Sequence, residues 1–118
     1  MEIAEIKHDN FVTIRPVGEL DANSSIFVDE KMNQLLEEKL YNIHVDCSGI
    51  SYISSAGLGV FISYLDEIVS QGGRLIFSDM TSNVFDVFDL LGLNQIMEIV
   101  KTSAEAQTQF EYEGQNPS

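Results

Sequence analysis

The order of strand-like and helix-like segments is the feature of this 118-residue chain that most restricts its fold. Short runs rich in β-branched and aromatic residues alternate with longer stretches whose apolar residues recur at helical spacing. The strand-like runs are 3–6, 11–15, 43–47, 75–77 and 96–100. The resulting order, β-β-α-β-α-β-α-β-α, predicts an α/β fold in which helices pack against a mixed sheet of about five strands, opened by an antiparallel hairpin.

Turn and capping residues mark the ends of these segments. Asp9 and Asn10 form the hairpin turn, and the second strand is expected to end near Pro16 and Gly18. The candidate helix caps are Asn23, Ser24, Ser25, Ser54, Thr81, Ser82 and the pair Thr102 and Glu105, with Gly72, Gly73 and Gly92 as stops. We expect one domain over residues 1–112 and a frayed tail over 113–118.

Each expected helix has an apolar face; in the first helix it comprises Val28, Met32, Leu35, Leu36 and Leu40. In the helix that follows Ser54, this face comprises Leu58, Phe61, Ile62, Leu65, Ile68 and Val69. In the shorter helix before Gly92, it comprises Val84, Phe85, Phe88 and Leu91. In the last helix, Ala106 and Phe110 share one face.

Charge and cysteine content restrict the function. The chain has 19 acidic and 6 basic residues, giving a formal net charge of −13, which excludes a general nucleic-acid binder or a ligand of anionic membranes. No apolar run approaches the ~20 residues that span a bilayer, and the first residues do not resemble a secretory signal. We therefore expect a cytoplasmic protein with neither nucleic-acid nor membrane partners. A single cysteine, Cys47, excludes an internal disulfide, and no metal-binding spacing is present.

The segment from Ser54 to Gly59 enters the most regular helix of the chain. Ser54 suits the N-cap, and Ser55 then falls in the first turn, where unpaired amides and the helix dipole favour an anion. Gly57 and Gly59 each cost the helix up to ~1 kcal/mol relative to alanine, but they would let a partner approach the serine closely. Taken alone, these residues fit ordinary capping and tight helix–sheet packing more often than a site. A nucleotide loop is excluded because no Lys-Ser/Thr pair follows.

Residues 50–60, Ile-Ser-Tyr-Ile-Ser-Ser-Ala-Gly-Leu-Gly-Val, closely resemble the signature of STAS domains, specifically the bacterial anti-sigma factor antagonists. Residues 18–22 resemble the second marker of that family, and residues 72–75 and 85–93 match later stretches. The resemblance implies a STAS-like fold in which Ser55 is phosphorylated by a partner kinase. Many members carry aspartate directly before this serine, whereas this chain has Ser54, which is the alternative phosphoacceptor.

The resemblance also implies a function by partner switching in transcription regulation. The unphosphorylated protein would bind an anti-sigma factor, itself a serine kinase with its own ATP and Mg²⁺, and so release a sigma factor. A serine phosphatase would reset Ser55. The expected partner-binding surface comprises Asp21, Ala22, Asn23, Ser24, Ser54, Ser55, Ala56, Gly57, Leu58 and Gly59. We expect no catalytic residue, cofactor or metal, and we expect Gly57→Ala to stabilise the isolated domain slightly while hindering docking.

Three other interpretations remain open. The chain could be a STAS module of another stress-signalling or lipid-transport assembly. It could instead be a response-regulator receiver phosphorylated on Asp46, with Ser78 and Lys101 at the ends of later strands. A receiver needs acidic metal ligands directly before its first helix, and here Asp9 is followed by a strand. An enzyme using His8 or His44 with Cys47 is disfavoured, because His44 and Cys47 are predicted to point to opposite faces of a strand.

Overall fold

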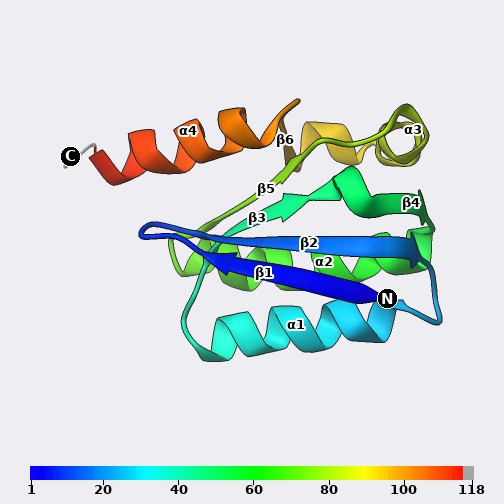
Figure 1. Ribbon diagram of the computed structural model, residues 1–118, viewed down its shortest axis with the longest axis horizontal. Coiled ribbons are helices and arrows are strands. Elements are labelled where there is room, and N and C mark those ends of the chain that lie inside the picture. Colours follow the sequence, from blue (N-terminus) through cyan, green and yellow to red (C-terminus); the bar gives the residue numbers. More distant parts are fainter. Residues whose placement is uncertain (116–118) are drawn as a thin grey trace.

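The computed structural model describes the backbone of residues 1–115 and the side chains of residues 1–111. The strands are β1 (Glu2–Lys7), β2 (Val12–Leu20), β3 (Asn42–Asp46), β4 (Ile50–Ile53), β5 (Arg74–Ser78) and β6 (Glu98–Ile99). The helices are α1 (Ser25–Glu37), α2 (Ser55–Ser70), α3 (Ser82–Leu90) and α4 (Ser103–Gln115), with short 3-10 helices η1 (Cys47–Gly49) and η2 (Leu93–Gln95). This order confirms the predicted α/β class (Figure 1).

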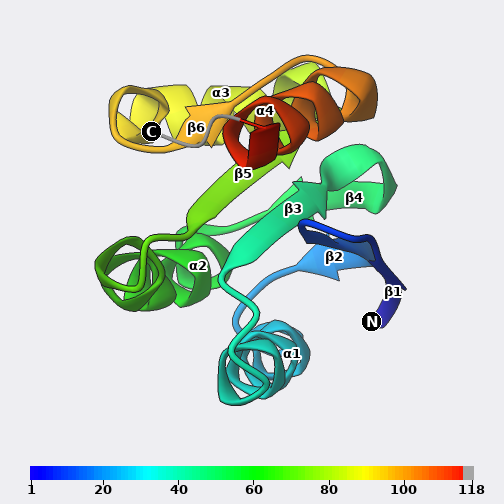
Figure 2. The ribbon, with the colours of Figure 1, turned by 90° about the vertical axis from the view of Figure 1, so that its left-hand side faces the viewer.

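The sheet is mixed, as predicted, but it has six strands rather than about five. Its order is β1-β2-β3-β5-β6, and β4, which the sequence analysis missed, pairs with the far end of β2. Only the β1–β2 pair is antiparallel; the other pairs are parallel. Helices α1 and α2 lie on one side of the sheet, and α4 lies on the other (Figure 2). Helix α3 buries Val84 and Phe88 in the same core as α1 and α2.

Strand β2 is longer than predicted, because Pro16 and Gly18 do not end it. Pro16 lies within the antiparallel pair, opposite Ile3 of β1. Gly18 has a φ of 121°, and the register with β4 shifts between Gly18 and Glu19. This bulge lets the first half of β2 pair with β3 and the second half with β4, so the strand changes its partner where a break was expected.

Two apolar cores lie on the two sides of the sheet. The main core contains Phe61 of α2, Phe77 of β5 and Phe88 of α3, whose rings meet edge to face at centroid distances of 5.2 and 5.4 Å. The second core joins Phe11 and Ile76 to Ala106 and Phe110 of α4, which confirms the predicted inner face of α4.

The predicted buried faces of α2 and α3 are too wide. In α2, Leu58, Phe61 and Ile68 are buried, whereas Ile62 and Val69 are exposed. In α3, Val84 and Phe88 are buried, whereas Phe85 and the C-cap residue Leu91 are exposed. Spacing identifies the apolar residues of a helix, but the neighbouring elements decide how wide a stripe they cover.

The ends of the last elements follow local capping rules. Thr81 accepts a hydrogen bond from the amide of Val84, and Gly92 has a φ of 73° after α3. Thr102 accepts from the amide of Glu105 at 3.1 Å, but the Glu105 carboxylate bonds the amide of Lys101. Strand β6 is shorter than the predicted run 96–100 because η2 and a turn precede it. Residues 113–115 of the expected tail are the end of α4, and 116–118 lie outside the described residues.

Candidate functional site

Two neighbouring parallel strands end side by side and carry the predicted site. Leu20 at the end of β2 is in register with Ile53 at the end of β4. The next residues, Asp21 and Ser54, therefore leave the sheet at the same edge, and the amide of Ser54 donates to the carbonyl of Leu20 at 2.9 Å. The loop before α1 and the first turn of α2 thus lie together at one end of the molecule (Figure 1).

Ser54 is the N-cap of α2, as predicted. Its backbone is extended, and its hydroxyl accepts a hydrogen bond from the amide of Gly57 at 3.3 Å. Its carbonyl accepts the first helical bond, from the amide of Leu58. The Ser54 side chain is half-buried and is already used by the helix.

Ser55 is the first residue of α2, and it is exposed. Within residues 1–111, no side chain or backbone group forms a hydrogen bond with its hydroxyl. The helical geometry leaves the amides of Ser55 and Ala56 without partners inside the helix. A phosphoryl group on Ser55 would lie beside these donors and the positive end of the helix dipole, so this position accommodates a doubly charged group.

Asp21 lies in the neighbouring loop, and its carboxylate is organised by backbone amides. Its Oδ1 accepts from the amides of Ser24 and Asn23, both at 3.0 Å. These bonds, chiefly that from Ser24, lower the pKa of Asp21. A carboxylate with a lowered pKa is ionised at neutral pH, so a fixed negative charge lies beside the first turn of α2.

Ser24 precedes α1 but does not cap it through its side chain. Its hydroxyl instead accepts from the amide of Asp21 and contacts the carbonyl of Glu19 at 2.6 Å. The cap candidate Ser25 is the first residue of α1. Ser24 therefore stabilises the loop that carries Asp21.

Gly57 and Leu58 are placed differently from what the sequence analysis expected. A Cβ on Gly57 would lie 2.7 Å from both the carbonyl oxygen and Cγ of Leu20, so this glycine is required for α2 to pack on β2. The expectation that Gly57→Ala stabilises the domain is therefore wrong. Leu58 is fully buried, so neither residue presents a side chain to a partner. A Cβ on Gly59 would meet no atom within 4 Å.

Asp46 and Ser78, the residues on which a response-regulator receiver would depend, have structural roles here. Asp46 accepts from the amide of Ser48 at 2.9 Å and caps η1, and its other oxygen lies 4.0 Å from Nε of Arg15. Ser78 is fully buried and bonds to His44. In residues 1–111, three or more potential metal ligands are nowhere gathered together.

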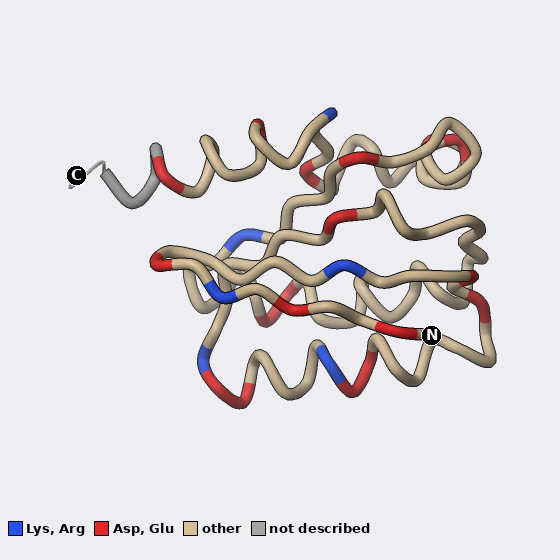
Figure 3. Tube along the Cα trace, in the orientation of Figure 1, with Lys and Arg blue, Asp and Glu red and all other residues tan. Residues whose placement is uncertain are grey.

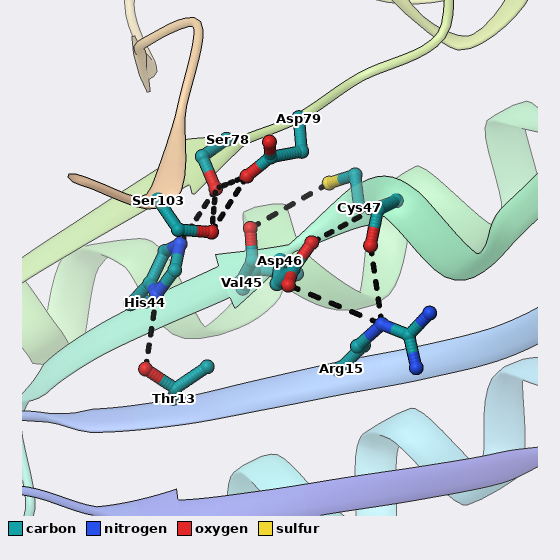
Figure 4. Close-up of polar contacts among 10 residues, drawn as sticks. Thr13, Arg15, His44, Val45, Asp46, Cys47, Ser78, Asp79 and Ser103 are labelled. Atoms are coloured by element: carbon teal, nitrogen blue, oxygen red, sulfur yellow. Dashed lines mark hydrogen bonds and ion pairs between the residues drawn. The ribbon is translucent and has the colours of Figure 1, made fainter. Parts of the chain in front are cut away.

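Cys47 and His44 belong to the two different cores, in agreement with the predicted opposite faces. Cys47 is buried in the main core, and burial raises the pKa of its thiol far above the usual range. His44 packs near Phe11 on the α4 side and bonds to Thr13 and Ser78 (Figure 4). This polar group was not predicted from the sequence, because its members become neighbours only through strand pairing.

The surroundings of Ser55 are acidic. Lys and Arg are absent from residues 16–30 and 40–73, which supply the loop before α1 and all of α2. Figure 3 shows Asp and Glu, and no Lys or Arg, at the end of the molecule where β2 and β4 finish. A partner that docks here meets a negative surface.

The profile of the STAS domain family matches residues 2–106. The chain belongs to the STAS domain family. An anti-sigma-B factor antagonist of Bacillus subtilis is 29% identical over 93 residues, covering 79% of this chain and 84% of that protein.

Solved structures share the fold. A Thermotoga maritima protein described as an anti-sigma factor antagonist has a TM-score of 0.87 at 24% identity, covering 92% of this chain and 94% of that one. The anti-sigma factor antagonist SpoIIAA in its unphosphorylated form has a TM-score of 0.80 at 23% identity, covering 94% and 97%. Bacillus SpoIIAA in its phosphorylated form has a TM-score of 0.70 at 23% identity, covering 92% and 98%. Among residues 1–115 of this STAS domain, no helix has both the length and the apolar character that crossing a membrane requires.

Proposed function

We propose that this STAS domain is an anti-sigma factor antagonist whose docking is switched by phosphorylation of Ser55. The observation that carries the proposal is that the two adjacent serines at the start of α2 have different roles. Ser54 is occupied as the N-cap, while the neighbouring Ser55 hydroxyl is exposed and unbonded within the described chain. The B. subtilis relative is named an anti-sigma-B factor antagonist, which supports the same function.

The partner would be an anti-sigma factor that is a serine kinase and supplies its own ATP and Mg²⁺. It would dock on those residues of the expected surface that are not buried, namely Asp21, Ala22, Asn23, Ser24, Ser54, Ser55, Ala56 and Gly59. Docking would release a sigma factor, and a serine phosphatase would reset Ser55. Sigma factors act in the cytoplasm, which is where this protein would work. It would act by binding alone, without a catalytic residue of its own.

Phosphorylation would reject the partner without unfolding the domain. A phosphoserine adds about −1.5 to −2 charges and three acceptor oxygens, which the amino terminus of α2 stabilises. A partner lying flush on Ser55 would have to strip water from this group next to the Asp21 carboxylate. A differential binding free energy of about 3 kcal/mol lowers the affinity by more than a hundredfold, which is enough for a switch.

The test compares wild type with Ser55→Ala and Ser55→Asp, with Ser51→Ala as a control at another exposed serine. The anti-sigma factor is captured from the native cell, identified, produced recombinantly and titrated against each variant. We expect the Ala variants to bind like wild type and Ser55→Asp to bind at least tenfold more weakly. Both Ser55 variants, but not Ser51→Ala, should lose kinase-dependent phosphate.

Two results would overturn the proposal. One is mass spectrometry that places the phosphate on Ser54 or elsewhere. The other is equal affinity of wild type and Ser55→Asp for the partner. An acid-labile acyl phosphate on Asp46 would instead favour the receiver interpretation.

A further inference from the structure

A continuous chain of polar side chains crosses the sheet on the side that α4 covers. Nε2 of His8 lies 3.0 Å from Oγ1 of Thr13, which lies 3.0 Å from Nδ1 of His44. Nε2 of His44 lies 2.6 Å from Oγ of Ser78, whose hydroxyl donates to Oδ2 of Asp79 at 2.7 Å (Figure 4 shows the chain from Thr13 onward). Strand register explains the alignment, because Thr13 pairs with His44, and His44 pairs with the residue two before Ser78.

When both histidines are neutral, the hydrogen bonds along this series of side chains have one possible order of donors and acceptors. An ionised carboxylate only accepts hydrogen bonds, so Ser78 donates to Asp79 and must accept from Nε2–H of His44. Neutral His44 then has a bare Nδ1, which accepts from the Thr13 hydroxyl. The oxygen of Thr13 in turn accepts from Nε2–H of His8. Asp79 therefore sets the tautomer of His44, and that tautomer orients Thr13.

This order of hydrogen bonds requires a neutral His44 and an ionised Asp79, and the environment of each residue favours that state. Burial lowers the pKa of His44 against the opposing effect of Asp46 and Asp79, and His8 lowers it further. Burial alone would raise the pKa of Asp79, but the hydrogen bonds from the hydroxyls of Ser78 and Ser103 lower it overall. His44 is thus held neutral and Asp79 ionised near neutral pH.

Both ends of this series of polar side chains, Asp79 and His8, are linked to α4. At one end, Oδ2 of Asp79 accepts a hydrogen bond from Ser103, the first residue of α4, at 2.7 Å. At the other end, the ring of His8 stacks on Phe11 with centroids 4.2 Å apart, and Phe11 stacks on Phe110 of α4 at 4.6 Å. The attachment of α4 therefore depends on the side chains that begin and end the chain.

Through the Thr13 hydroxyl, the protonation of each histidine affects the hydrogen bonds available to the other. Protonating His8 leaves its Nε2–H donating to Thr13, so the chain does not change. Protonating His44 adds a proton at Nδ1, so Thr13 must reverse and donate to Nε2 of a neutral His8. When both histidines are protonated, the buried Thr13 oxygen faces two N–H donors and its own proton loses its acceptor.

We propose that His8 controls the protonation of His44 through Thr13, and that α4 stays attached to the sheet while at most one of the two histidines carries a proton. The other charged groups that act on His44 are Asp46 at the end of β3, which lies near Arg15, and Asp79 after β5. From α4, the uncharged Ser103, Ala106 and Phe110 pack against these side chains. The charged groups near His8 are Asp9 and, on α4, Glu111, which line a hollow together with it. The inference is independent of the switch proposed at Ser55.

Two substitutions of the exposed His8 test this coupling as a matched pair, because both remove the ring that stacks on Phe11 and they differ in charge. In His8→Gln the side chain is always neutral and its oxygen can accept from Thr13. In His8→Arg it is always charged and can only donate, as protonated His8 does. The ring nitrogens of His44 are followed by NMR between pH 4 and 8, and amide hydrogen exchange of α4 is measured across the same range.

At pH 7.5 we expect His44 of wild type to carry its proton on Nε2. In His8→Gln its titration midpoint should move up by about one pH unit, a tenfold higher proton affinity, and α4 should stay protected while His44 titrates. In His8→Arg the midpoint should remain at or below that of wild type, and α4 should exchange faster once His44 is protonated.

Three results would overturn the inference: a proton on Nδ1 of His44 at pH 7.5, the same midpoint in His8→Gln and His8→Arg, or unchanged α4 exchange when both histidines of wild type are charged.

Discussion

At the start of α2, two serines and two glycines that are close in sequence have different structural roles. Ser54 bonds to the helix, whereas Ser55 faces solvent. Gly57 allows α2 to touch the carbonyl of Leu20, whereas Gly59 lies against open space. Each difference follows from the helix, because residues one or two positions apart point in different directions around its axis.

The two glycines therefore respond differently to alanine. We expect Gly57→Ala to lower the free energy of unfolding by about 1–3 kcal/mol, because its Cβ would overlap the backbone of Leu20. Gly59→Ala, the matched control, should raise it by up to ~1 kcal/mol through helix propensity. Urea denaturation of both variants measures this. Equal stability of Gly57→Ala and wild type would show that α2 does not need a glycine there.

At the scale of elements, the candidate site is built by β2 and β4 rather than by α2 alone. The bulge at Gly18 turns β2 from β3 toward β4, and the pairing of Leu20 with Ile53 brings Asp21 to the first turn of α2. A parallel pair delivers both following loops to the same edge, which is why the loop before α1 and the start of α2 form one surface.

Substitutions of Ser54, the N-cap of α2, and of Ser55, the candidate phosphorylation site, should have different effects on stability. Ser54→Ala removes the acceptor of the Gly57 amide and should cost about 1 kcal/mol of stability. Ser55→Ala removes a hydroxyl that bonds to nothing in the described chain, so its stability should stay within about 0.5 kcal/mol of wild type. Thermal and urea denaturation compare the two variants. A larger loss in Ser55→Ala than in Ser54→Ala would reverse the assigned roles.

At the scale of the whole molecule, the negative charge is spread over the surface, while two titratable groups with shifted pKa values, His44 and Asp79, lie under α4. His44 and Asp79 join β3, the end of β5 and α4, three segments distant in sequence. Their pKa values differ from those of an unfolded chain, so the stability of the molecule is linked to pH.

Acid should destabilise the protein in two stages. Because the folded pKa of His44 lies below its usual 6.5, the unfolded chain binds the proton more tightly, and stability falls as the pH drops through 6.5. The lowered pKa of Asp79 adds stability above about pH 4, which is lost as the pH falls through its folded value. Urea denaturation between pH 8 and 3 in 0.3 M salt, which screens the net charge, measures both stages. His44→Gln should flatten the first stage only; an unchanged slope there would contradict this assignment.

The sequence by itself determined what depends on near neighbours. The alternation of segments, the cap at Ser54 and the left-handed stop at Gly92 follow from residues a few positions apart, and the signature at 50–60 marked Ser55. Each of these signals is read from local periodicity, backbone freedom or a short motif.

Only the tertiary structure decided which surfaces meet. The pairing of β4 with β2, the need for a glycine at 57 and the hydrogen bonds of His44 to Thr13 and Ser78 all depend on contacts between residues 30 or more positions apart. Such contacts are made when strands choose their partners, and pairing registers are not encoded in any short stretch of chain.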